Sequence, residues 1–131
     1  MSAPLTAVVV VTHGRAGADM IEAAQQFLHM ELPLVASVGI NCEDGRDVVD
    51  SKINQAVEAL GVESRDVLFL VDLVGSTPAR LCCGKCTDKG HVVTGLNMPM
   101  LVKLATADRS HRPADLGSEL IATGTKSIHA E

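Results

Sequence analysis

The strongest folding signal in this chain is an alternation of short apolar segments with longer amphipathic ones. Residues 5–11 are rich in β-branched side chains and have no polar alternation, as in a parallel strand that is buried on both faces. Residues 34–40 and 67–71 repeat this pattern, and residues 91–94 are a shorter version of it. The segments between them carry apolar side chains three or four positions apart. Strands that alternate with helices predict a parallel sheet built from right-handed βαβ units.

Helices are expected over residues 18–30, 47–60, 78–87, 99–107 and 115–122. The inner face of the first is predicted to consist of Met20, Ile21, Ala24, Phe27 and Leu28, and that of the second of Val48, Ile53, Val57 and Leu60. The third has Pro78 at its first position, with Ser76 or Thr77 as N-cap. We therefore expect a doubly wound α/β fold in a single domain, residues 1–131. Its four-stranded, mainly parallel sheet has the order 2-1-3-4, with helices on both faces.

Composition argues against several functions. The chain has 131 residues and a net charge of −5, without a cluster of basic residues, and 2% of its residues are aromatic. It therefore lacks both the positive surface and the stacking side chains of a nucleic-acid-binding protein. The apolar run of residues 7–11 is too short for a signal peptide or a membrane span, so we expect a cytoplasmic protein.

Three of the four cysteines are crowded at Cys82, Cys83 and Cys86, unlike the spacing of a secreted disulfide framework. We expect reduced thiols that pack as small apolar side chains. Cys83 and Cys86 also have the spacing of a redox pair or of half a zinc site, and both alternatives stay open. No metal and no cofactor are predicted. Met98 and Met100 are expected in the core, and His29, His91, His111 and His129 at the surface or its boundary.

Polar segments follow the first and third predicted strands. The first contains His13 and the second begins with Asp72. Functional groups of a parallel sheet gather at the carboxyl ends of its strands, so these two side chains face each other if their strands are neighbours. A carboxylate that accepts a hydrogen bond from one ring nitrogen fixes the imidazole tautomer and leaves the other nitrogen free to attack an electrophile. The alternative is that both residues only cap loops.

The surroundings of this pair favour a phosphoryl group. Two helices are predicted to begin there, and their first backbone N–H groups have no partner within the helix. Candidate donors to the phosphoryl group are Gly14, Arg15, Ser76 and Thr77, and Thr12 adds a hydroxyl. Known nucleotide-binding motifs are not matched: Gly14 to Gly17 lacks the third glycine of a dinucleotide motif, and Ala79 stands where a P-loop has its first glycine.

Three blocks of the sequence together resemble the enzyme IIA component of mannose-family phosphotransferase systems. They are Thr12-His13-Gly14 after an apolar strand, Asp72 followed by a Gly-Ser-Thr-Pro turn, and Asn97-Met98-Pro99-Met100. The resemblance extends over residues 5–125. One position departs from the family, which usually has glycine where this chain has Ser76. A side chain there can restrict the φ angle of the turn or crowd the phosphate.

The resemblance implies that His13 takes a phosphoryl group from the histidine-phosphocarrier protein and passes it to a IIB component, in sugar transport or in regulation. It also implies that Asp72 hydrogen-bonds His13, that the Ser76-Thr77 turn covers the phosphate, and that Asn97, Met98 and Pro99 border the site. Contact with a membrane is then only indirect, through a IIC/IID permease. Family members are homodimers that exchange a C-terminal strand, and residues 126–129 have the alternation of such a strand.

Two alternatives to the phosphoryl carrier remain within this fold. One is the phosphotransfer subunit of a dihydroxyacetone kinase, which shares the fold and the early histidine. The other is a regulatory binding module without phosphoryl transfer, although the presence of both His13 and Asp72 argues against it.

Overall fold

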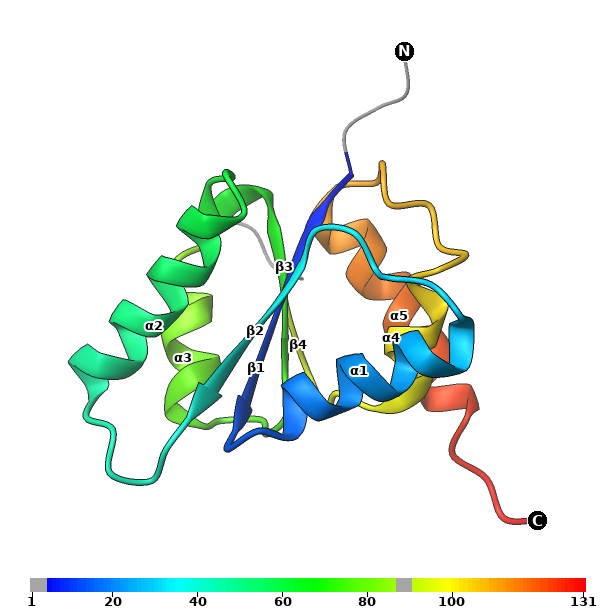
Figure 1. Cartoon of the computed structure of the whole chain (residues 1–131), viewed down its shortest axis with the longest axis horizontal. Coiled ribbons are helices and arrows are strands. Elements are labelled where there is room, and N and C mark those ends of the chain that lie inside the picture. The colour runs from blue at the N-terminus through cyan, green and yellow to red at the C-terminus, as the bar shows by residue number, and fades with distance from the viewer. Residues whose placement is uncertain (1–4, 87–90) are drawn as a thin grey trace.

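The computed structural model describes residues 5–86 and 91–131, in which a parallel sheet lies between two layers of helices (Figure 1). Its strands are β1 (Ala7–His13), β2 (Val35–Ile40), β3 (Val67–Val71) and β4 (Val92–Thr94), in the order β2-β1-β3-β4. This confirms the predicted fold class and strand order. His13 pairs with Ile40, and Val11 pairs with Val71, so β1, β2 and β3 end at the same edge of the sheet.

Helices cover both faces of the sheet. They are α1 (Ala16–Leu28), α2 (Arg46–Ala59), α3 (Thr77–Cys83), α4 (Met98–Lys103) and α5 (Pro113–Lys126), and a 3₁₀ turn, η1 (Ser64–Asp66), precedes β3. Figure 1 shows α2 and α3 on one face and α1, α4 and α5 on the other. Each layer encloses its own cluster of buried apolar side chains, so the sheet separates two cores.

The apolar runs of the sequence are explained by this double burial. Val8 and Val10 of β1 belong to the core under α1, α4 and α5, whereas Val9 and Val11 belong to the core under α2 and α3. All four side chains are 0% exposed. Burying an aliphatic side chain of this kind stabilises a fold by roughly 1.5 to 3 kcal/mol, so a polar residue at any of these positions would be costly.

Two residues assigned to inner helix faces lie outside. Phe27 of α1 is 71% exposed, and Val48 of α2 is 46% exposed. In α2 the buried stripe is Val49, Ile53 and Val57, four positions apart, so Val48 is displaced by one residue from the stripe. The sequence pattern therefore predicted the position of α2 correctly but assigned Val48 instead of Val49 to its buried face.

Helix ends differ from the predictions mainly near the C-terminus. α3 ends at Cys83, so Cys86 lies beyond it, and the predicted helix end at Thr87 lies outside the described residues. α5 runs four residues past the predicted end at residue 122 and passes through Gly124. A Cβ atom on Gly124 would lie 2.7 Å from the Met100 side chain, so this glycine allows α5 to pack closely against α4.

The expected C-terminal strand is not formed in the single chain. Lys126 is the last residue of α5, and residues 127–131 form neither helix nor strand. An exchanged strand needs a second chain to pair with, so its formation stays a prediction. No described helix is long and apolar enough to cross a membrane.

The core methionines and the outer histidines were only partly predicted correctly. Met100 is buried, and Met98 packs half-buried against the same core. His91, however, is only 7% exposed, because it directly precedes β4 and its carbonyl accepts the Phe69 N–H at 2.8 Å. The prediction of a boundary position for His91 was therefore wrong.

Candidate functional site

β1 ends at His13, where the chain leaves the sheet in a tight turn. Gly14 has φ of +57°, and its N–H donates to the Ile40 carbonyl at 2.7 Å. The Gly14 carbonyl also passes so close to β2 that a Cβ atom on Gly39 would lie 2.5 Å from it. This geometry therefore requires glycine both at position 14 and at position 39. The turn leaves the His13 side chain 48% exposed at the edge of the sheet.

Asp72 follows β3 and lies against His13. Its Oδ2 atom is 3.0 Å from His13 Nδ1 and accepts the His13 backbone N–H, also at 3.0 Å. Its Oδ1 atom accepts the Leu73 backbone N–H at 2.9 Å. Both carboxylate oxygens are thus bound to N–H donors, which fixes the carboxylate while the imidazole remains accessible.

The charge of this carboxylate determines the state of the imidazole. Burial alone would raise the pKa of Asp72, but the hydrogen bonds from the His13 backbone and ring, the charge of the ring and the Leu73 N–H together lower it below 3.8. An ionised carboxylate accepts hydrogen bonds only, so Nδ1 must carry the shared proton. In the neutral ring Nε2 then has the free lone pair, so this nitrogen is the one able to act as a nucleophile.

The turn after Asp72 accommodates Ser76 without strain. Gly75 has φ of +72°, where glycine is favoured, whereas Ser76 has φ of −71° and ψ of 163°. Ser76 is the N-cap of α3: its Oγ accepts the Ala79 N–H at 3.4 Å and donates to the Leu73 carbonyl at 2.8 Å. The Ser76 side chain therefore does not force the turn into an unfavourable φ angle.

A cavity of about 310 Å³ adjoins His13. Its walls are Thr77 and Pro78 at the start of α3, and Ile40 to Cys42, Asp44, Arg46 and Val49 from the end of β2, the following loop and α2. The segment 41–46 was missed as part of the site by sequence reasoning. It follows a strand that ends at the same edge as β1, and this position was the available signal.

The β2–α2 loop is fixed by an ion pair. Asp44 Oδ2 accepts the Asn41 N–H at 2.9 Å and lies 2.6 Å from Lys52 Nζ, which also donates to the Gly39 carbonyl at 3.2 Å. The bond from Lys52 and the Asn41 N–H lower the pKa of Asp44. Arg46 lines the same wall and contributes a positive charge to the cavity. The negative charge of Asp44 is already paired with Lys52.

Other predicted site residues lie outside this cavity. Thr12 is fully buried, and its Oγ1 accepts the Gly17 N–H at 2.7 Å, so it anchors the start of α1. The Arg15 side chain is 85% exposed and 3.9 Å from Asp19. Asn97 caps α4 and donates to the Gly124 carbonyl at 3.3 Å, while Met98 and Pro99 follow it in α4.

All four cysteines are free thiols. Burial raises the pKa of Cys82 to about 12 and also raises the pKa of Cys86, which makes both poor thiolates. Within residues 5–86 and 91–131, no group of three or more potential ligands is arranged to hold a metal ion. Cys82 lies in the core and Cys86 packs against it, as the packing interpretation expects, whereas Cys83 is exposed.

Comparisons with solved structures support the fold. The mannose/sorbose-specific IIA subunit of the phosphotransferase system from Enterococcus faecalis is similar, with a TM-score of 0.80, 23% identity and coverage of 99% of this chain and 96% of that one. The component EIIA from Streptococcus agalactiae has a TM-score of 0.75, 18% identity and coverage of 95% of both chains. The IIA protein associated with the fucose utilization operon of Streptococcus pneumoniae has a TM-score of 0.75, 20% identity and coverage of 99% and 96%.

Comparison with curated proteins gave no match. A family model described as "PTS system fructose IIA component", with the short name EIIA-man, matches residues 7–119, which include both His13 and Asp72. The resemblance carried by the three sequence blocks is thereby confirmed at the level of the family. The chain belongs to the EIIA-man family of phosphotransferase-system IIA components.

Proposed function

We propose that this chain is a phosphoryl carrier of a phosphoenolpyruvate-dependent sugar phosphotransferase system and that His13 Nε2 carries the group. The observation behind the proposal is the 3.0 Å contact between His13 Nδ1 and the Asp72 carboxylate, on an imidazole that is half exposed at the edge of the sheet. Membership of the family supports a role in phosphotransfer. The donor is then the histidine-phosphocarrier protein, and the acceptor is a IIB component.

The transfer step is an exchange of one P–N bond for another. The Nε2 lone pair attacks the phosphorus atom, the new Nε2–P bond forms, and the P–N bond to the donor's imidazole breaks with its electron pair returning to that ring. His13 keeps its Nδ1 proton and becomes a positively charged phosphoimidazolium. Asp72 stabilises this charge through the same hydrogen bond that orients the ring.

The phosphoryl oxygens need donors around Nε2. We assign this role to the turn of Ser76 and Thr77 and to Arg15, whose exposed side chain can turn toward the group. The expected donor role of Gly14 is not retained, because its N–H is already bonded to the Ile40 carbonyl at 2.7 Å. Thr77 supports this assignment because it lines the cavity beside His13. Thr12, Asn97, Met98 and Pro99 are assigned a supporting role at the border. Arg46, which sequence reasoning missed, adds a cation on the opposite wall.

Phosphorylation in a reconstituted system tests the proposal. The chain is incubated with phosphoenolpyruvate and the two general phosphocarriers, and should gain one acid-labile, base-stable phosphate on Nε2, identified by ¹⁵N-correlated NMR. His13→Ala should gain none, while His111→Ala, which removes another exposed histidine, should be labelled like the wild type. Labelling of His13→Ala would refute the assignment. A folded wild type that no phosphocarrier labels would favour the regulatory binding module.

The remaining assignments follow from the same proposal. We propose a cytoplasmic homodimer that exchanges its C-terminal segment, and that reaches a membrane only through a IIC/IID permease. Transport and regulation both use the same phosphohistidine. The alternative is that the chain passes its phosphoryl group to a dihydroxyacetone kinase instead of a IIB component. Offering both acceptors to the phosphorylated chain distinguishes these two functions.

A further inference from the structure

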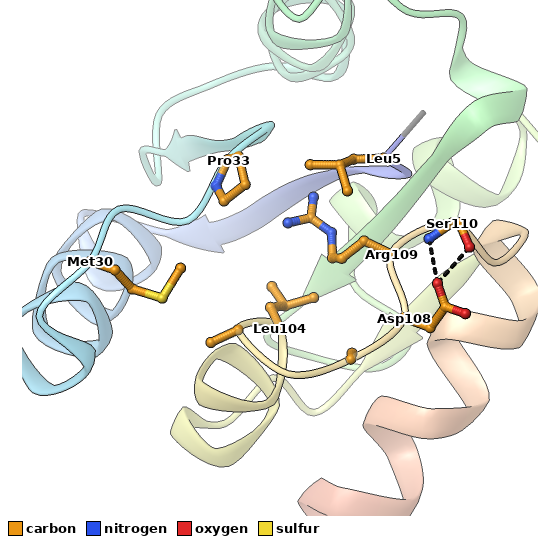
Figure 2. Close-up of a pocket in the computed structure, with 9 residues that line it drawn as sticks. Leu5, Met30, Pro33, Leu104, Asp108, Arg109 and Ser110 are labelled. Carbon is orange, nitrogen blue, oxygen red and sulfur yellow. Dashed lines mark hydrogen bonds between the residues drawn. The ribbon is translucent and has the colours of Figure 1, made fainter. Parts of the chain in front are cut away.

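A second cavity, of about 440 Å³, lies at the edge of the sheet opposite His13. Leu5 directly before β1 and Pro33 before β2 line it, together with Met30 after α1 and Leu104 after α4 (Figure 2). These four side chains give it an apolar wall. Arg109, from the loop between α4 and α5, contributes a charged group to the same cavity.

Arg109 is buried, with 5% of its surface exposed. Its Nε and Nη2 atoms donate to the Thr6 carbonyl at 3.2 and 2.7 Å, and Nη2 also lies 3.4 Å from the Leu34 carbonyl. Its Nη1 atom is buried and has no hydrogen-bond partner among the described residues. Buried donors are normally paired, so an unpaired N–H of a guanidinium is an unusual feature that needs an explanation.

In the part of the chain that the structure describes, the charge of Arg109 also lacks a counterion. Within residues 5–86 and 91–131, no carboxylate forms an ion pair with it. Its neighbour Asp108 is turned away in Figure 2, toward Ser110, whose N–H it accepts at 3.0 Å. Burial lowers the pKa of Arg109, but a guanidinium stays protonated at neutral pH. Among the described residues, this buried positive charge is therefore held by the backbone carbonyls of Thr6 and Leu34.

We propose that this cavity binds a small organic monocarboxylate, with its carboxylate on Arg109 and its hydrocarbon part against the apolar wall. A planar guanidinium with a free N–H matches a carboxylate, which would supply the missing acceptor and counterion together. One positive charge suits a monoanion, and Asp108, which also lines the cavity, has its Oδ1 bound to the Ser110 N–H. The apolar wall favours an aliphatic chain over a sugar or an inorganic ion.

Access of the ligand to Arg109 requires a local movement. Nη1 is shielded from water, so the carboxylate has to displace side chains of the wall to reach it. Leu5 and Met30 are the wall residues suited to this movement, because they are 38% and 43% exposed. Leu104, in contrast, is 2% exposed and part of the core, so it forms a fixed wall.

Titration with hexanoate, followed by ¹H–¹⁵N NMR, tests the proposal. Saturable shifts are expected for residues 104–110 and the Arg109 Nε–H, without comparable shifts at His13. Hexanamide, the uncharged control, should bind about 10- to 100-fold more weakly, as expected for the loss of a bond between charged groups. Equal binding of hexanoate and hexanamide, shifts that never saturate, or inorganic phosphate binding as tightly as hexanoate would overturn the proposal.

Variants locate the site. Ala107→Phe, which fills the cavity and keeps Arg109, should abolish the shifts, and undiminished binding would contradict the proposal. Arg109→Met should remove the preference for hexanoate over hexanamide, and where this variant does not fold, Ala107→Phe decides. His13→Ala should bind hexanoate like the wild type, which keeps this test independent of the proposed phosphoryl transfer.

Discussion

Replacing Asp72 by Asn tests how the carboxylate prepares His13. Oδ2 accepts two N–H groups from His13, and Oδ1 accepts the Leu73 N–H. An amide has only one oxygen, so either orientation of the introduced side chain points its NH₂ group at an N–H donor. If the NH₂ group faces Nδ1, it donates to the ring and moves the ring proton to Nε2, which blocks the nucleophile.

The magnitude follows from the bonds that are lost. A hydrogen bond to a charged group contributes about 1.5 to 3 kcal/mol, against about 1 kcal/mol for a neutral one. The phosphoimidazolium also loses the negative charge that stabilises it. A loss of about 2 to 3 kcal/mol in the transition state slows phosphoryl transfer roughly 30- to 160-fold.

The assay is single-turnover transfer from the phosphorylated histidine-phosphocarrier protein, with the folded state checked by circular dichroism. Asp47→Asn is the matched control, since it also removes a carboxylate near the site, in the first turn of α2, but Asp47 is exposed and does not line the cavity. It should transfer at close to the wild-type rate. If Asp72→Asn is as fast as this control, the carboxylate does not set the tautomer and the reasoning fails.

Three further predictions concern stability, assembly and the thiols. Replacing Cys82, Cys83 and Cys86 together by Ala should leave transfer near normal and lower only the free energy of unfolding, as measured with urea; loss of transfer with an intact fold would revive the redox interpretation. Light scattering should give a dimer at micromolar concentration, and deletion of residues 127–131, which spares α5, should weaken it; a dimer that survives the deletion unchanged would exclude strand exchange. Because the folded-state pKa of Asp72 lies below its ordinary value of 3.8, its ionisation stabilises the fold above that pH, and this contribution is lost as the pH falls through the folded-state pKa. The difference in unfolding free energy between wild type and Asp72→Asn should accordingly be larger at pH 7 than at about pH 3, and an equal difference at both would contradict the pKa direction.

The fold was predictable because its strands are buried on both faces. Residues 67–71, for example, are continuously apolar, and β3 has the same bounds. His13 and Asp72 were found because polar residues directly follow such runs. Helix faces were less certain: Val48 and Val49 are chemically identical, and only packing against the sheet decides that Val49 is the buried one.

Features that depend on contacts far apart in sequence could not be predicted. Arg109 lies in a polar segment that suggests an exposed loop, yet it binds the Thr6 carbonyl across 103 positions. The loop 41–46 contains Cys42, Glu43 and Asp44 but matches no motif, and its one signal was its place after a strand that pairs with β1. The tail of α5 continues through Gly124 because packing against Met100 outweighs the low helix propensity of glycine.

If His13 carries the phosphoryl group as we propose, its open position has a consequence for the lifetime of the phosphorylated protein. Enzymes that protect a reactive intermediate usually close around it and expel water. Here 48% of the imidazole surface faces solvent, which lets two different proteins approach the same nitrogen in turn but also admits water to the P–N bond. In the proposed relay, spontaneous hydrolysis would compete with delivery, and the yield would depend on how quickly the acceptor arrives. The abundance of the acceptor in the cell would thus become part of the proposed mechanism.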